Sequence, residues 1–227
     1  MRGSHARNVY VDNNAVNGNK AGAVYTCRYP GAIATGARPY HHGNLRQALL
    51  DRAERTLADR GVQALSLREL ARDAGVSHAA PRRHFPDKQA LLEALAESGF
   101  VRLADELSAA AAGAGPEFHA RLLSVARAYV RFATDHAALL ELMFASKHRP
   151  DAAESLRAAS TQAFAAPLAV VADGQASGDV VPGDLDGIAQ AAWATVHGVA
   201  SMVAAGMAGE RLIDDAVALL VDGLRPR

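Results

Sequence analysis

The stretch LRELARDAGVSHAAPRRHF, residues 67–85, decides how this chain is interpreted. It opens as a helix, because Leu67, Leu70 and Ala74 recur at the spacing that places side chains on one helical face. Gly75 then allows a sharp bend in the backbone. We expect a second short helix after this bend. Two short helices joined by Gly-Val-Ser have the length and turn of a helix-turn-helix.

Serine residues mark the start of both short helices. Ser66, with Glu69 three residues later, matches a capping box. Ser77 is placed to cap the second helix, which we expect to end near Phe85. Val76 can fill the wedge between the two helices.

The second helix presents small and basic side chains that can contact nucleic acid. Small residues let a helix N-terminus approach a major groove closely, and its free N–H groups suit phosphate. An arginine there can pair with guanine or hold a phosphate. Lys88, at the start of the following helix, can reach the flanking backbone. The other candidate contacts are Ser77, His78, Ala79, Arg82 and Arg83.

Composition favours packed helices. Hydrophobic residues make up 50% of the 227 residues and aromatic residues only 5%, while alanine, the best helix former, is abundant. Residues 1–40 carry five basic residues against one acidic residue, whereas residues 101–227 carry ten against fifteen. An excess of positive charge in the N-terminal part suits contact with an anion. The alternative is that this charge difference arises by chance, because the counts are small. The single cysteine, Cys27, excludes an intrachain disulfide framework and a cysteine-based zinc site.

Glycine and proline divide the chain into segments. Residues 1–39 lack lasting periodicity and are expected to form a disordered tail, whose first residues resemble an expression tag. The uncharged run 187–209 is long enough to span a bilayer, but its Ala, Gly and polar residues favour a buried helix. We expect a linker at 109–116. The expected helices lie at about 44–61, 66–74, 77–85, 86–108, 117–135, 137–145, 151–177, 185–206 and 211–223.

Residues 41–92 resemble the DNA-binding domain of the TetR family of transcriptional regulators. The resemblance implies an all-α fold with a helix-turn-helix domain at 40–87, followed by a larger helical ligand-binding and dimerisation domain at 88–227. The matching features, in order, are Ala48–Leu57, Gly61, Leu65–Ala71, Ala74–Ser77, and His84–Lys88 followed by Leu91 and Leu92.

The sequence departs from the family at Pro81 and Arg82, where members usually have Leu-Tyr. A proline near a helix start costs little, so we expect the helix to tolerate Pro81. Arg82 replaces a tyrosine that typically touches phosphate in the family, and arginine can keep that contact. The operator sequence therefore cannot be taken from relatives.

The resemblance adds further candidate DNA contacts. Ser66 joins the set. His84 either packs beneath the recognition helix or donates to a phosphate. His42 is interpreted as a phosphate contact or helix cap, because two adjacent histidines rarely form a metal site. Arg38 lies in an arm that can reach the minor groove.

The resemblance also implies a pocket for an unidentified small-molecule effector. Bulky residues of the C-terminal half are candidates to line it, although most such residues belong to a core. Trp193–Gly198 resembles the Trp…His-Gly (WHG) signature of one C-terminal subclass. His197 is either a core histidine or a ligand contact; other polar anchors could be His119, His136 and His148. The candidate pocket residues are Phe132, Met143, Phe144, Phe164, Trp193 and His197.

The last two helices suit a twofold dimer. The small residues of 187–209 allow close approach, and an apolar stripe near the C-terminus would complete a four-helix bundle. The candidate dimer residues are Val199, Met202, Val203, Ile213, Val217 and Leu220.

The sequence thus predicts a cytoplasmic homodimeric regulator, a repressor, that binds double-stranded operator DNA and is released by a small molecule. It predicts no enzymatic activity, cofactor, metal or membrane contact. An enzyme on a helical scaffold is one alternative, but HExxH, GxSxG, Walker A and GxGxxG motifs are absent. A metal sensor using His119, His136 and His148 is another, although their spacing has no metal signature. A third is a regulator whose partner is another protein.

Overall fold

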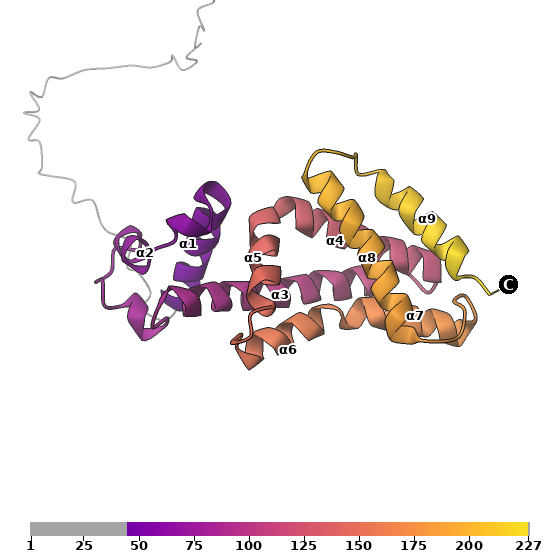
Figure 1. Ribbon diagram of the computed structural model, residues 1–227, viewed down its shortest axis with the longest axis horizontal. Coiled ribbons are helices and arrows are strands. Elements are labelled where there is room, and N and C mark those ends of the chain that lie inside the picture. The colour runs from indigo at the N-terminus through magenta and orange to yellow at the C-terminus, as the bar shows by residue number, and fades with distance from the viewer. Residues whose placement is uncertain (1–44, 227) are drawn as a thin grey trace, which may run out of the picture. The chain divides into compact units, whose positions relative to one another are not determined.

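The computed structural model describes residues 45–226, and within this range all regular secondary structure is helical (Figure 1). The predicted all-α fold is therefore confirmed. The predictions for the tail at 1–39, for the start of the first helix at residue 44, and for Arg38 and His42 lie outside the described residues.

The N-terminal helices form where the apolar spacing predicts them. Helix α1 (Leu45–Arg60) ends before Gly61, whose φ of 75° is a left-handed value that glycine adopts readily. A short 3₁₀ turn, η2 (Val62–Ala64), leads to helix α2 (Leu67–Asp73). Helix α1 packs against α2 and α3. The buried side chains of α1 and α2 are Leu49, Leu50, Ala53, Leu57, Leu70 and Ala71.

The predicted capping box at α2 is wrong, although the helix begins where it was expected. Ser66 has the extended backbone of an N-cap, but its side chain makes no capping hydrogen bond. Glu69 instead forms an ion pair with Arg60, 3.4 Å between Oε2 and the guanidinium. Ser66 thus occupies the N-cap position of α2, but the reciprocal hydrogen bonds of a capping box do not form.

The predicted helix at 77–85 is also wrong, and Pro81 supplies the reason. A proline has no N–H to donate to the carbonyl four residues earlier, and its ring crowds that carbonyl. The Ser77 carbonyl accepts from Ala80 instead, at 3.0 Å, which closes a turn. A single 3₁₀ turn, η3 (Pro81–Arg83), follows, and the Pro81 carbonyl accepts from both His84 and Phe85. The segment is a pair of tight turns rather than an α-helix.

Helix α3 (Lys88–Gly113) begins at Asp87, whose carboxylate accepts a hydrogen bond of 2.8 Å from the Ala90 N–H. It extends through most of the stretch that was predicted to be a linker at 109–116. The alanines of this stretch favour helix, so the helix continues until Gly113. Helix α3 packs against α1, α4, α5, α6 and α7, so it contacts both halves of the chain.

The C-terminal half surrounds α3 and α4 (Phe118–Asp135) (Figure 1). Helix α5 (Ala137–Lys147) follows directly, because His136 both ends α4 and precedes α5 with φ −129° and ψ 38°. The helix predicted at 151–177 is split into α6 (Glu154–Ala163) and α7 (Ala165–Ser177). Pro167 explains the split, since it cannot donate to the Ala163 carbonyl.

Helices α8 (Leu185–Ala204) and α9 (Leu212–Leu224) pack against each other and both against α4. Three of the six residues predicted for a dimer interface lie in the core of the single chain: Val199, Ile213 and Val217. They face α4 and its neighbours, so an interface on the outer face cannot contain them. Val203 and Leu220 are half-buried, and Met202 is 40% exposed.

Candidate nucleic-acid interface and small-molecule pocket

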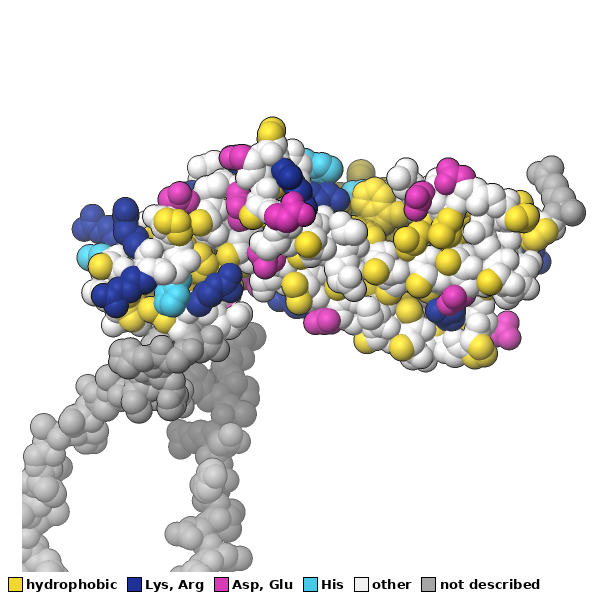
Figure 2. Space-filling view, turned by 90° about the horizontal axis from the view of Figure 1, so that it is seen from below, with side chains coloured by type: hydrophobic (Ala, Val, Ile, Leu, Met, Phe, Trp, Pro, Cys, Tyr) yellow, Lys and Arg dark blue, Asp and Glu magenta, His cyan; other side chains and the backbone are white. Residues whose placement is uncertain are grey.

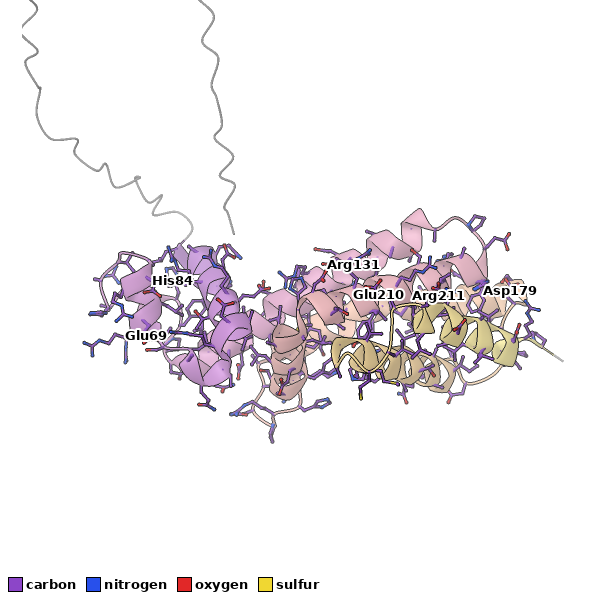
Figure 3. All side chains as sticks on the ribbon, turned by 90° about the horizontal axis from the view of Figure 1, so that it is seen from above. Glu69, His84, Arg131, Asp179, Glu210 and Arg211 are labelled. Carbon is purple, nitrogen blue, oxygen red and sulfur yellow. The ribbon has the colours of Figure 1, made fainter. Side chains whose placement is uncertain are left out.

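An exposed basic face follows α2. We define the basic face as the exposed residues Ser77, His78, Ala79, Arg82, Arg83 and His84, together with half-buried Lys88. Lys, Arg and His side chains gather on this N-terminal part of the molecule (Figure 2). Figure 3 shows His84 here, well separated from Arg131. Ser66 is half-buried beside the basic face.

Buried side chains hold the basic face in place. Pro81 is buried and Phe85 is only 1% exposed. The Arg46 guanidinium of α1 lies 5.6 Å from the centre of the Phe85 ring, a cation–π contact. Because Pro81 and Phe85 are anchored inward, the three residues between them, which include Arg82 and Arg83, are exposed to solvent. His84 is exposed, so the alternative in which it packs beneath the segment does not hold.

The charges of the basic face are not neutralised by the chain itself. Within residues 45–226, Arg82, Arg83 and Lys88 form no ion pair. Arg60 and Arg72 on the neighbouring helices do, with Glu69 and Asp73. The basic face therefore carries unpaired positive charge that can bind an anion.

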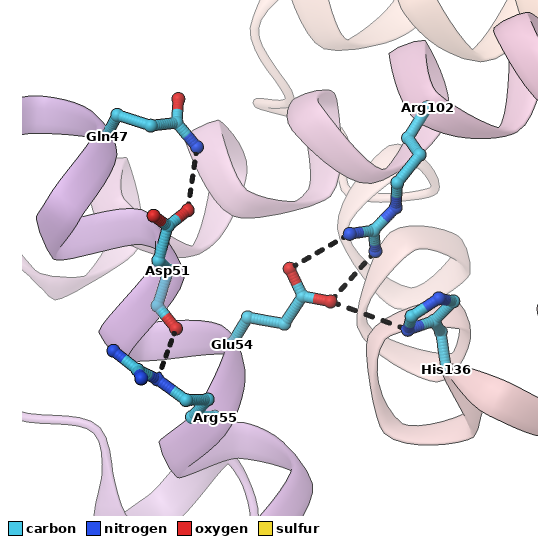
Figure 4. Close-up of polar contacts among 6 residues, drawn as sticks. All are labelled: Gln47, Asp51, Glu54, Arg55, Arg102 and His136. Atoms are coloured by element: carbon cyan, nitrogen blue, oxygen red, sulfur yellow. Dashed lines mark hydrogen bonds and ion pairs between the residues drawn. The ribbon is translucent and has the colours of Figure 1, made fainter.

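A polar junction joins α1 to the C-terminal helices (Figure 4). Arg102 of α3 donates to both carboxylate oxygens of Glu54 on α1, at 2.8 and 3.4 Å. His136 Nδ1, between α4 and α5, lies 3.5 Å from the same carboxylate. The Arg102 guanidinium also lies 5.5 Å from the centre of the Phe132 ring. One carboxylate of α1 thus contacts both α3 and the residue that links α4 to α5.

A cavity of about 460 Å³ lies among α5, α6, α7 and α8. This volume falls in the range of small-molecule sites, about 300–1,000 Å³. Its walls include aromatic, apolar and polar side chains: Lys147, Gln162, Phe164, Leu168, Gln190 and Trp193. We call it the α5–α8 pocket.

Aromatic packing fixes one wall of the α5–α8 pocket. Phe164 meets Trp193 edge-on, with centroids 5.7 Å apart. The His197 ring stacks on Trp193 at 4.9 Å and 14°. Tyr129 and His197 share a hydrogen bond of 2.8 Å between Oη and Nδ1. Phe144 packs against both Trp193 and His197, so five rings form one cluster.

Burial sets the charge states within the cluster. It raises the pKa of the Tyr129 hydroxyl, which therefore stays protonated. Burial, and then the nearby charge of Lys147, lowers the pKa of His197 and favours the neutral imidazole. The Trp193 indole N–H is buried and lacks a hydrogen-bond partner in the described residues.

Lys147 lines the pocket but was not among the residues predicted for it, and neither were Gln162, Leu168 and Gln190. Its Nζ lies over three rings, 4.6 Å from Phe144, 5.6 Å from Phe164 and 5.9 Å from Phe100. Burial lowers the pKa of Lys147. The only sign of this role in the local sequence is one positively charged residue at the end of an apolar helix. Its position over the rings depends on packing between distant segments.

The structure brings together four of the six predicted pocket residues: Phe144, Phe164, Trp193 and His197. Phe132 and Met143 are core residues, 1% and 0% exposed, and neither lines the pocket. Among the predicted anchors, His119 and His148 are exposed, and His136 belongs to the junction with Glu54.

In the described residues, no three His, Cys, Asp or Glu side chains are grouped as a metal site would require. None of the helices described has both the length and the hydrophobicity needed to cross a bilayer.

Comparisons with known proteins place both halves of the chain in one family. Residues 49–95 match the family model for bacterial regulatory proteins of the tetR family. Residues 122–224 match the model for the tetracyclin repressor-like C-terminal domain. The chain belongs to the TetR family. The narrower WHG subclass remains a prediction, since the C-terminal match is to the general description.

Two solved structures share the fold of this chain. A solved protein of unknown function from Rhodococcus sp. RHA1 is 48% identical, with a TM-score of 0.76, over 83% of this chain and 100% of its own. A TetR family transcription regulator from Marinobacter aquaeolei VT8, 20% identical, shares the fold, with a TM-score of 0.65 over 81% of this chain and 96% of its own.

The HTH-type transcriptional repressor AcnR of Corynebacterium efficiens is 36% identical over 77 residues, which are 34% of this chain and 39% of that protein. The match to curated relatives such as this one therefore spans only about two fifths of their length.

Proposed function

We propose that this chain is a repressor that binds double-stranded operator DNA as a homodimer and releases it when a small molecule fills the α5–α8 pocket. The observation that carries the proposal is the exposed basic face, whose arginines have no ion-pair partner in the described residues. Unpaired arginines on a rigid segment suit phosphate and guanine, which offer matching acceptors. A regulator of this kind works where the DNA lies, so the proposal places the chain in the cytoplasm.

The tight turns at 77–85 bear on how the DNA would be contacted. A continuous recognition helix offers several free N–H groups at its N-terminus. Four of the N–H groups in this segment, those of Ala80, Arg83, His84 and Phe85, are already used within turns. Side chains therefore supply the contacts, and we assign phosphate contacts to Arg82, Arg83 and Lys88. Ser77, His78 and Ala79 are the residues for base readout.

The dimer would form through the outer faces of α8 and α9. The exposed residues on α8 are mostly small, among them Ala191, Ala194 and Gly198, which permit close approach of a second helix. Met202 is 40% exposed and Leu219 is 74% exposed, an unusual exposure for large apolar side chains. A twofold axis here would place two basic faces roughly 34–36 Å apart, or somewhat more, to meet successive half-sites.

Helix α5 offers the route by which a ligand would act on DNA binding. Its Lys147 lines the pocket, its Phe144 packs against the pocket residue Trp193, and its N-cap, His136, contacts Glu54 of α1. A ligand that prefers one position of α5 would therefore bias the position of α1.

Fluorescence anisotropy tests the proposal. The full chain is titrated onto DNA from upstream of its own gene and onto scrambled DNA, between about 50 and 200 mM salt, where phosphate contacts cost orders of magnitude in affinity. We expect specific, salt-sensitive binding that is lost in Arg82→Ala and Arg83→Ala. Arg131→Ala is the matched control, because it removes an exposed arginine from α4 that has no ion-pair partner in the described residues.

Two results would count against the proposal. Specific binding that survives both arginine substitutions would move the interface away from the basic face. If neither the upstream DNA nor a genomic selection yields a specific site, the chain is not an operator-binding repressor.

A further inference from the structure

The half-buried Lys147 is the most unusual group in the described part of the chain. It is one of two lysines in residues 45–226, the other being Lys88 on the basic face. Three aromatic rings surround its ammonium group, the nearest centroid 4.6 Å from Nζ. It forms no ion pair within this range. An ammonium group that is partly removed from water is normally paired, because desolvation is otherwise costly.

The rings compensate Lys147 only in part. Aromatic faces attract the ammonium group, but they do not supply the charge-assisted hydrogen bonds that an anion accepts from its N–H donors. The ammonium group of Lys147 therefore lacks an anionic partner within the described residues. Nearby Arg149, by contrast, is exposed and pairs with Asp151 at 2.8 Å.

The α5–α8 pocket opens onto this lysine. Lys147 lines the cavity together with Phe164, Leu168 and Trp193, so a bound molecule would meet an ammonium group and a flat apolar wall at once. The cavity also contains one carboxylate, Asp186, on the exposed first turn of α8. Solvent screens the exposed Asp186, whereas the half-buried Lys147 is screened less, so the positive charge dominates within the pocket.

We propose that the α5–α8 pocket takes an organic monocarboxylate with a flat apolar body, its carboxylate on Lys147 and its body against Phe164 and Trp193. This inference rests on the proposed function, because it assigns the ligand class of the same effector pocket. A ligand of this class replaces the missing anionic partner of Lys147. A neutral or cationic molecule of the same shape does not.

Trp193 makes a direct test feasible, because it is the chain's single tryptophan. Its fluorescence therefore reports on the pocket without DNA, so this test does not depend on operator binding. The full chain is titrated with 4-phenylbutyrate, with its neutral amide 4-phenylbutanamide, and with the amine 4-phenylbutylamine. These three probes share one body and differ in the charge of one end.

We expect a saturable change of Trp193 emission with 4-phenylbutyrate, and binding weaker by about tenfold or more for the amide and the amine. Lys147→Met keeps the length of the apolar stem and should lose the preference for the carboxylate. Lys147→Arg should retain it. Arg149→Met, which removes a neighbouring exposed cation, should bind as the wild type does.

Three results would overturn the proposal. They are equal binding of the acid and its amide, preference for the amine, and an unchanged preference for the acid in Lys147→Met. The absence of any emission change with all three probes at millimolar concentration would also overturn it. Specific DNA binding in the anisotropy assay would then show that the proposed function stands while this ligand assignment fails.

Discussion

Replacing Glu54 by glutamine tests the junction between α1 and the C-terminal helices with almost no change in shape. The substitution removes the carboxylate that accepts from Arg102 at 2.8 and 3.4 Å and lies 3.5 Å from His136. Arg102 would then keep its partly buried charge beside a neutral amide and the Phe132 ring, and its Nε is already buried without a partner in the described residues.

The magnitude follows from how exposed the pair is. Breaking a fully buried ion pair costs about 3–5 kcal/mol, whereas an exposed pair contributes about 0–1 kcal/mol. The side chains of Arg102 and Glu54 are 38% and 27% exposed, between these limits. After discounting for solvent screening, we expect Glu54→Gln to lower the free energy of unfolding by about 1–2 kcal/mol.

Thermal unfolding followed by circular dichroism measures this loss. For a chain of this size each 1 kcal/mol lowers Tm by about 2–4 °C, so we expect a decrease of about 2–8 °C. Glu69→Gln is the matched control. It removes a pair at 3.4 Å whose side chains are 58% and 42% exposed, and we expect a loss below about 0.5 kcal/mol. Equal losses in the two variants would refute the assignment of Glu54 as a junction residue.

Three further predictions concern packing, assembly and pH. Gly174→Ala places a Cβ 2.7 Å from Val180 and 2.8 Å from the Phe118 ring; we expect a net loss of about 1–2 kcal/mol by urea unfolding, and a gain in stability would contradict this packing. A Cβ at Gly198 would meet nothing within 4 Å in the single chain, so we expect Gly198→Leu to fold and sedimentation to show a monomer of 23.8 kDa, while a persisting dimer would exclude the α8 face as the interface. The lowered pKa of His197 means that the unfolded chain binds this proton more readily; stability should therefore fall as pH drops below the ordinary value of 6.5, and less so in His197→Gln. Parallel pH profiles of the two proteins would contradict that role.

Local patterns predicted most helices because their causes are local. The spacing of apolar residues placed α1, α2 and α4, and Gly61 ended α1 as its backbone requires. The same reasoning failed where two local preferences compete. Ser77 as an N-cap favours a helix through Pro81, but proline has no N–H to donate, and the Ser77 carbonyl accepts from Ala80 instead.

The pocket could be predicted only in outline. Bulky residues such as Phe164 and Trp193 are visible in the sequence, but their neighbours depend on how distant helices pack. Lys147 acquires its role only because α3, α5 and α6 bring three phenylalanines beneath it. Phe132 and Met143 have the same character as true pocket residues, and tertiary packing alone assigns them to the core.

The central claim is that the arginines of the basic face hold DNA phosphates, and the salt dependence of operator affinity tests it most directly. Each phosphate contact adds about 0.9 to the slope of log K against log salt concentration. The double variant Arg82→Ala, Arg83→Ala removes two contacts from each protomer, so the slope for a dimer should become shallower by about 3–4. Arg131→Ala should leave it unchanged. A double variant with the wild-type slope would contradict the account, because the basic face would then carry no phosphate contacts.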